Sequence, residues 1–234
     1  MIASDDIEET RQMDVETRAL QSRGASSTPV YEMVAKAIAA RYQGGGVLVD
    51  VGCGNGHLWS FVREHFDRYI GVDVLRYDGL PTEAEFIPLD LDSGTAPLPE
   101  RVADVVCSVE TIEHLENPRA FMRELVRLTK PGGWVIVTTP NQLSLLSKLT
   151  LGLKNQFNAF QEAPGLYPAH ITALLEIDLI RIAKECGLAD VKIEYSDQGR
   201  IPFTGWNWPK MFKFRGRSFS DNICLIGSYP KNFN

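Results

Sequence analysis

Short apolar runs alternate along the first two thirds of the chain with segments whose apolar residues recur at helical spacing. The runs are rich in Val and Ile and have the length of buried strands: residues 47–51, 69–74, 85–89, 104–109 and 134–139. The helical segments are residues 28–42, 57–65 and 118–129, and Pro29 suits the first turn of the first of them. Strands that alternate with helices predict an α/β fold, a doubly wound and mostly parallel sheet with helices on both faces.

The last third of the chain follows a different pattern. An amphipathic helix is predicted over residues 171–186, ended by Gly187, and two further strands over 190–195 and 222–227. Lys130-Pro131-Gly132-Gly133 predicts a turn before the fifth strand. We therefore expect one domain over residues 29–234, with insertions at 141–170 and 198–220. Residues 1–28 are polar, and we expect a loose arm or a short helix that closes over a site.

Composition places the chain among ordinary globular proteins, with 44% hydrophobic and 23% charged residues. Its 24 basic and 30 acidic side chains give a net charge of -6, which argues against a broad nucleic-acid-binding surface. The four cysteines form no C-x-x-C pair, and Cys107 and Cys224 lie in apolar runs, as buried thiols do in a reducing compartment. No apolar stretch approaches eighteen residues, and the acidic N-terminus is unlike a signal peptide. We therefore expect a soluble, cytoplasmic protein.

A glycine-rich loop follows the first predicted strand and precedes a helix. It consists of Gly52, Cys53, Gly54, Asn55 and Gly56. Glycines serve where the backbone turns sharply or must touch a ligand without an intervening Cβ. The spacing is G-x-G-x-G, unlike the G-x-G-x-x-G of dinucleotide sites, and Asp50 just before the loop would repel a pyrophosphate and attract an ammonium group. The loop therefore favours a cationic ligand without phosphate.

Two more aspartates follow later strands of the predicted sheet. Asp73 ends the second strand, where a carboxylate can accept hydrogen bonds from both hydroxyls of an adenosine ribose. Asp90 ends the third strand, where it could accept from an adenine amino group. Because the carboxyl ends of parallel strands meet at one edge, we expect Asp50, Asp73 and Asp90 to converge on one crevice.

These motifs together resemble class I S-adenosylmethionine-dependent methyltransferases, over roughly residues 30–140. Residues 49–56 resemble the first motif of that family, Asp73 its ribose-binding acid and Asp90-Leu91 its adenine contact. Residues 104–106, 112–118 and 128–133 resemble the fourth strand, the following helix and the turn before the fifth strand. The resemblance implies a Rossmann-like sheet of seven strands with the last antiparallel, and S-adenosylmethionine as cofactor. It also implies cofactor contacts from Val74 and Val109, besides the three aspartates, Leu91 and the residues of the loop.

Methyl transfer is an in-line displacement, so the protein has to align the acceptor and remove its proton. Glu110, Glu113 and His114 stand at i, i+3 and i+4 after the fourth strand and would share one face of a helical turn. Their Glu-x-x-Glu-His spacing resembles the ubiquinone-biosynthesis O-methyltransferases, and that resemblance implies Mg²⁺ bound by this trio. We expect positioning or structural roles and no metal, with Mg²⁺ as the alternative.

His170 is the second catalytic candidate, and it lies just before the helix predicted over 171–186. Relatives often place a histidine here, facing the methyl group, and a histidine of near-neutral pKa suits a hydroxyl acceptor as its base. The alternative is a histidine that caps the start of the helix.

The two insertions are the expected acceptor-binding elements. Residues 198–220 combine five basic and several aromatic side chains, which would suit an anionic glycan, a membrane surface or a packed lid; we expect no nucleic-acid partner. We therefore expect O-methylation of a small molecule or of a glycan or lipid-linked precursor. N- or C-methylation, a nicotinamide oxidoreductase and a non-catalytic cofactor-binding protein are the alternatives, and the loop spacing and Asp50 disfavour the oxidoreductase.

Overall fold

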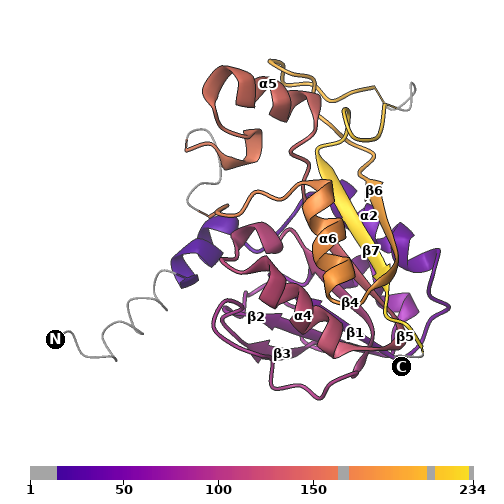
Figure 1. Ribbon diagram of the computed structural model, residues 1–234. Helices are drawn as coiled ribbons and strands as arrows, with labels where there is room; N and C mark the ends of the chain where they lie inside the picture. Colours follow the sequence, from indigo (N-terminus) through magenta and orange to yellow (C-terminus); the bar gives the residue numbers. More distant parts are fainter. Residues whose placement is uncertain (1–14, 163–168, 210–213, 232–234) are drawn as a thin grey trace.

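The computed structural model describes residues 15–162, 169–209 and 214–231. Its centre is a seven-stranded sheet in the order β3-β2-β1-β4-β5-β7-β6 (Figure 1). The strands are β1 (Val47–Val51), β2 (Arg68–Asp73), β3 (Glu85–Pro88), β4 (Ala103–Val109), β5 (Thr129–Pro140), β6 (Ala189–Tyr195) and β7 (Asn222–Ser228). β1 to β5 pair in parallel, whereas β7 is antiparallel to both β5 and β6. The predicted Rossmann-like sheet with an antiparallel last strand is confirmed.

Helices cover both faces of this sheet, as predicted. α2 (Thr28–Ala39) and α3 (His57–Val62) pack on one face, with buried side chains such as Val34 and Leu58 against Leu48 and Ile136 of the strands. α4 (Pro118–Leu128) and α6 (Glu176–Glu185) cover the other face (Figure 1). Short 3₁₀ turns occupy Arg63–His65, Ile112–His114 and Asn158–Phe160. Because the strands of the centre are buried on both sides, they appear in the sequence as continuous apolar runs.

Two predicted boundaries before residue 140 are wrong. The first helix ends at Ala39, three residues before the predicted end, and Gly44, Gly45 and Gly46 all take positive φ in the connection that follows. The predicted turn at 130–133 belongs to β5, which begins at Thr129 opposite Ala103. A shift of register between Ala103 and Val105 lets β5 continue through the glycines, so the turn residues mark an irregularity within a strand.

The amphipathic helix predicted over 171–186 begins only at Glu176, as α6. The main-chain amides of Ile171 and Thr172 both donate to the carbonyl oxygen of Glu113, at 2.9 Å each. An amide that donates to a distant carbonyl cannot also make the i→i−4 hydrogen bond of a helix. The apolar spacing therefore begins at residue 171, whereas the helix begins later. The Asp178 carboxylate then accepts from the Leu175 amide at 3.1 Å and starts α6.

The two insertions lie side by side at the outer end of the domain (Figure 1). α5 (Leu145–Lys154) occupies the first, and the Leu145 amide donates to the carbonyl of Ser218 in the second at 2.8 Å. Residues 163–168 and 210–213 of the insertions, like residues 1–14 of the predicted arm, lie outside the described ranges. Within those ranges, none of the helices combines the length and apolar character needed to cross a bilayer.

Candidate functional site

A cavity of about 350 Å³ opens at the carboxyl ends of β1 and β4. The chain passes from β1 outward to β2 and β3 and returns to β4 on the other side, and open α/β sheets bind ligands at such a point. Twelve of the predicted site residues line it: Asp50, Gly52, Cys53, Gly54, Asp73, Val74, Asp90, Leu91, Val109, Glu110, His114 and His170. Three others, Asn55, Gly56 and Glu113, are not among the lining residues.

The glycine loop forms the floor of the cavity, and two of its glycines, Gly52 and Gly54, leave no room for a side chain. Gly52 and Gly54 have φ of +78° and +50°, a region that favours glycine. A Cβ at Gly52 would overlap the Thr111 hydroxyl, and one at Gly54 would overlap the carbonyl oxygen of Gly24. The loop is therefore shaped so that a ligand can approach its main chain directly.

Asp50 is a buried acid with one unused oxygen. Its Oδ2 accepts a 2.8 Å hydrogen bond from the Tyr69 hydroxyl, whereas Oδ1 has no partner. Burial raises the pKa of Asp50 to about 7, because the charged form loses its hydration. An ammonium group in the cavity would both satisfy Oδ1 and stabilise the charge, as the sequence predicts.

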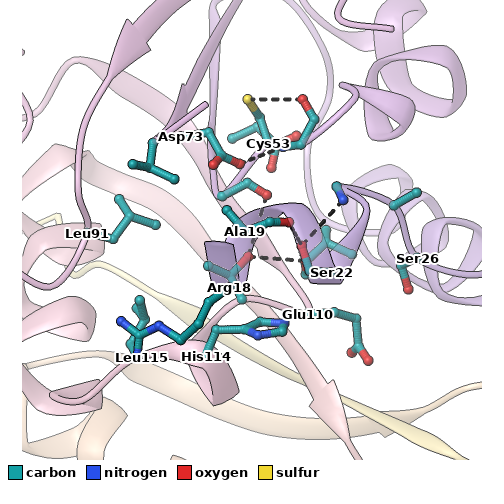
Figure 2. Close-up of a pocket in the computed structure, with 18 of the residues that line it drawn as sticks. Arg18, Ala19, Ser22, Ser26, Cys53, Asp73, Leu91, Glu110, His114 and Leu115 are labelled. Atoms are coloured by element: carbon teal, nitrogen blue, oxygen red, sulfur yellow. Dashed lines mark hydrogen bonds between the residues drawn. The ribbon is translucent and has the colours of Figure 1, made fainter. Parts of the chain in front are cut away.

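The next two aspartates line the same cavity. Asp73 Oδ2 accepts from the Gly54 amide at 2.8 Å, which ties the end of β2 to the glycine loop (Figure 2). Asp90 lines the cavity one strand further out, and its Oδ1 accepts from the Asp92 amide at 3.0 Å. The free oxygen of Asp50, the glycine floor and this row of carboxylates together fit S-adenosylmethionine, a cation without phosphate.

Glu110 lies at the other end of the cavity, directly after β4, in a left-handed conformation with φ +51°. Its Oε2 accepts a 2.6 Å hydrogen bond from the side-chain amide of Asn222, and its Oε1 is buried without a partner. Burial raises the pKa of Glu110 to about 7. A carboxyl group of this kind can change its protonation state at neutral pH, as a general base must.

His114 and His170 lie beside each other at the same end, with ring centroids 4.6 Å apart and planes at 74°. Burial lowers the pKa of His114, and it lowers that of His170 to about 4, so both rings are neutral at physiological pH. His170 is six residues away from the start of α6, so the alternative of a helix cap is wrong.

The structure divides the trio predicted as the Mg²⁺ alternative. Glu110 is held by Asn222, whereas Glu113 is fully buried behind the cavity and its Oε2 accepts from the Thr139 hydroxyl at 3.1 Å. The shared helical face does not form, because Ile112–His114 is a 3₁₀ turn. The potential metal ligands that converge are those of Glu113, His114 and His170, within 4.8 Å of one another. The residues present do not fit Mg²⁺ bound by Glu110, Glu113 and His114.

A segment before α2 forms the roof of the cavity. Residues 15–22 are helical, and lining side chains from this segment include Arg18 and Ser22 (Figure 2). Arg18 forms an ion pair with the side chain of Asp92 at 3.5 Å. The Tyr77 hydroxyl donates a 2.7 Å hydrogen bond to the carbonyl oxygen of Ala19. Asn55 donates to the carbonyl oxygen of Gly24 from both its main-chain and its side-chain amide. Asn55 therefore fastens the roof, which explains why it does not line the cavity.

Asn222 and Tyr31 were missed by the sequence analysis, although both line the cavity. A signal for Asn222 exists: it opens the antiparallel strand β7, whose first residue lies at the edge where the parallel strands end. Tyr31 lies within α2 and gives no such signal. Its hydroxyl accepts a 2.8 Å hydrogen bond from the amide of Ser26, in the segment that forms the roof.

The described part of 198–220 contributes no lining residue to the cavity. Three of its arginines are paired within the protein, Arg200 with Asp221, Arg215 with Asp197 and Arg217 with Glu176. Trp208, Phe214 and Phe219 pack on one another. Its place over the acceptor stays a prediction.

Comparisons with known proteins identify the family of this chain. Residues 30–193 match the family described as a methyltransferase domain. A probable S-adenosylmethionine-dependent methyltransferase of Mycolicibacterium smegmatis is 30% identical over 170 residues, which are 69% of this chain and 64% of that protein. A ubiquinone biosynthesis O-methyltransferase of Leptothrix cholodnii is 29% identical over 105 residues, 41% of this chain and 44% of that protein. The chain thus spans less than two thirds of the length of either relative.

Solved structures share the fold. A SAM-dependent methyltransferase from Archaeoglobus fulgidus superimposes with a TM-score of 0.60 over 85% of this chain and 94% of that one, at 19% identity. The matched region contains the glycine loop, the three aspartates, Glu110 and both histidines. The chain therefore belongs to the methyltransferase domain family, within the S-adenosylmethionine-dependent class.

Proposed function

We propose that the protein is an S-adenosylmethionine-dependent methyltransferase that methylates a hydroxyl group of a small molecule or of a glycan or lipid-linked precursor. The observation that carries the proposal is Glu110, a buried carboxyl group with a pKa of about 7 and a free oxygen at the end of the cavity opposite Asp73 and Asp90. Relatives named ubiquinone biosynthesis O-methyltransferases support oxygen as the acceptor atom.

The half of the cavity that contains Asp50 and Asp73, the cofactor half, binds and orients S-adenosylmethionine. S-adenosylmethionine supplies a methyl group on a positively charged sulfonium, which departs as a neutral thioether. The Asp50 carboxylate faces the cavity where it can pair with the ammonium of the amino-acid part, and Asp73 can accept from the ribose hydroxyls. These contacts fix the direction of the donor, on which an in-line displacement depends.

The acceptor half of the cavity removes a proton. Glu110 Oε1 can accept the proton of an acceptor hydroxyl, while Asn222 holds the other oxygen and fixes the orientation of the carboxylate. His114 and His170 are neutral and line the same end of the cavity, where their lowered pKa values keep them from competing for this proton. The roof, which contains Arg18 and is held by Tyr77, would shield the reacting groups from water.

Turnover of a panel of acceptors tests this function. Phenols, sugars and prenylated alcohols would be offered beside matching amines, with transfer of a labelled methyl group as the readout. We expect hydroxyl acceptors to be methylated, and Glu110→Gln to lower kcat about 10²–10⁴-fold with unchanged affinity for S-adenosylmethionine. Glu116→Gln, at an exposed position nearby, is the matched control. Turnover of amines alone, or full activity of Glu110→Gln, would contradict the proposal.

A further inference from the structure

Two segments far apart in the sequence bring three potential metal ligands together beside the cavity. Glu113 and His114 come from the 3₁₀ turn after β4, and His170 comes from the segment before α6. The segments are fastened by the two main-chain amides of Ile171 and Thr172, which both donate to the carbonyl oxygen of Glu113. The relative positions of the three side chains are therefore fixed by the backbone.

Each imidazole ring is oriented by a hydrogen bond to a main-chain carbonyl. Nδ1 of His114 lies 2.7 Å from the carbonyl oxygen of Ala169, and Nδ1 of His170 lies 2.9 Å from that of Ala159. A carbonyl oxygen can only accept, so each Nδ1 carries the hydrogen. Nε2 of His170 therefore keeps its lone pair and lies on the side of Glu113, whereas the His114 ring also contacts the backbone of Glu110. Histidines that bind metals are usually oriented in this way, by a hydrogen bond from the other ring nitrogen to a backbone carbonyl.

Glu113 supplies an oxygen that lacks any partner. The side chain is fully buried, Oε2 is satisfied by Thr139, and Oε1 makes no hydrogen bond. His170 Nε2 lies 4.0 Å from this oxygen, too far for a hydrogen bond. A buried carboxyl oxygen that is left unsatisfied is costly, and an ion between it and the two rings would satisfy it.

We propose that Glu113, His114 and His170 bind a divalent first-row transition metal ion such as Zn²⁺, Co²⁺ or Fe²⁺. Two imidazole nitrogens and one carboxylate oxygen are a donor set typical of these ions, whereas Mg²⁺ prefers oxygen ligands throughout. The ligand atoms lie within 4.8 Å of one another, and ligands on one zinc ion lie about 3–3.5 Å apart, so small rotations of the side chains complete the site.

The open coordination positions of such an ion would face the cavity, because His114 and His170 both line it. There the ion could bind an acceptor hydroxyl and lower its pKa, which would ease the proton transfer to Glu110. This role rests on the proposed function, whereas binding of the ion does not.

The test is a titration of chelator-treated full-length protein with Co²⁺, followed by the visible absorption that cobalt gains on binding nitrogen and oxygen ligands. We expect one equivalent to bind, displaced by Zn²⁺ and not by equimolar Mg²⁺. Glu113→Gln keeps the acceptor for Thr139, and His114→Gln changes a side chain at the cavity; each should weaken Co²⁺ binding at least about tenfold. His57→Gln, an exposed histidine outside the cavity, is the matched control and should bind Co²⁺ like the parent protein.

Binding of S-adenosylmethionine, measured on the same samples, shows that each variant is folded. The proposal is overturned if the parent protein binds no Co²⁺, or if folded Glu113→Gln and His114→Gln bind it as tightly as the His57→Gln control. Stoichiometric Co²⁺ binding in a protein that methylates no hydroxyl acceptor would confirm the metal site and contradict the proposed function, so the two failures are distinguishable.

Discussion

Asn222 Nδ2 donates a 2.6 Å hydrogen bond to Glu110 Oε2, and so joins the first residue of β7 to the residue that follows β4. This bond favours the ionised form of Glu110 and opposes the effect of burial on its pKa. The antiparallel strand therefore contributes to the end of the cavity at Glu110, whereas Asp50 and Asp73 come from the parallel strands.

Removing this bond should change the pH profile of the reaction. The proposed base acts when ionised, so kcat should rise with pH through the pKa of Glu110, about 7. In Asn222→Ala the pKa of Glu110 should be higher, and the rising limb should move to higher pH. Asn207→Ala, at an exposed position, is the control. An unshifted limb in Asn222→Ala would argue that another group accepts the proton.

Asp50 should make the protein without cofactor less stable as pH rises. Its pKa is about 7 in the folded protein and near 3.8 in the unfolded chain, so the folded state binds the proton more tightly. Its contribution to the free energy of unfolding is complete below pH 4 and is lost as pH rises through about 7. Asp50→Asn keeps the acceptor for Tyr69 and should remove this loss, which is on the order of a few kcal/mol.

The measurement for Asp50 is urea unfolding of both proteins at pH 5 and pH 8, without cofactor and with S-adenosylmethionine. The cofactor should stabilise the parent protein more than Asp50→Asn, because only the carboxylate can pair with the ammonium. Parallel loss of stability in the two proteins would show that Asp50 does not titrate in this range.

Asp73 should control the affinity for the adenosine part of the cofactor. Asp73→Asn keeps an oxygen for the Gly54 amide but loses the charge, and we expect S-adenosylmethionine to bind about 1–3 kcal/mol more weakly. Calorimetry measures this change, with Asp78→Asn on the exposed loop as the control and NAD as a ligand that should not bind. Equal affinity in Asp73→Asn and the parent protein would exclude a ribose contact.

We propose that the outer end of the domain contacts a lipid surface through its exposed apolar side chains. Phe203 and Trp206 are 74% and 77% exposed, and Leu153 at the end of α5 is 70% exposed. Phe203→Ala combined with Trp206→Ala should lower binding to anionic lipid vesicles about tenfold or more, because each substitution removes apolar area that the side chain would bury in the lipid. Affinity for S-adenosylmethionine should not change. Ile177→Ala, 46% exposed on α6, is the control, and vesicle binding equal to that of the control would contradict the proposal.

The sheet and the cofactor half of the site could be predicted because both depend on local patterns. A strand buried on two faces is apolar throughout, so it can be recognised in the sequence. A glycine loop followed by aspartates at strand ends can be recognised from its spacing along the chain alone. Gly52, Asp73 and Asp90 were therefore placed correctly in the cavity.

The acceptor half depends on contacts between distant segments, which spacing cannot reveal. The i, i+3, i+4 pattern joined Glu110 to Glu113 and His114, but residues 112–114 form a 3₁₀ turn and no shared helical face results. The potential ligand atoms that converge are those of Glu113, His114 and His170. The late start of α6 also results from a contact between distant segments. The carbonyl oxygen of Glu113 accepts hydrogen bonds from the amides of Ile171 and Thr172, which the apolar pattern assigns to a helix.

The roof of the cavity lies outside the residues that match the family, whereas the glycine loop below it lies inside them. The match to the family covers residues 30–193, whereas Arg18, Ser22 and the rest of the roof precede it. A change in this leading segment would reshape the cavity above the glycine loop and leave Asp50, Asp73 and Glu110 in place. Relatives with the same site residues could then differ in the molecules that the cavity admits.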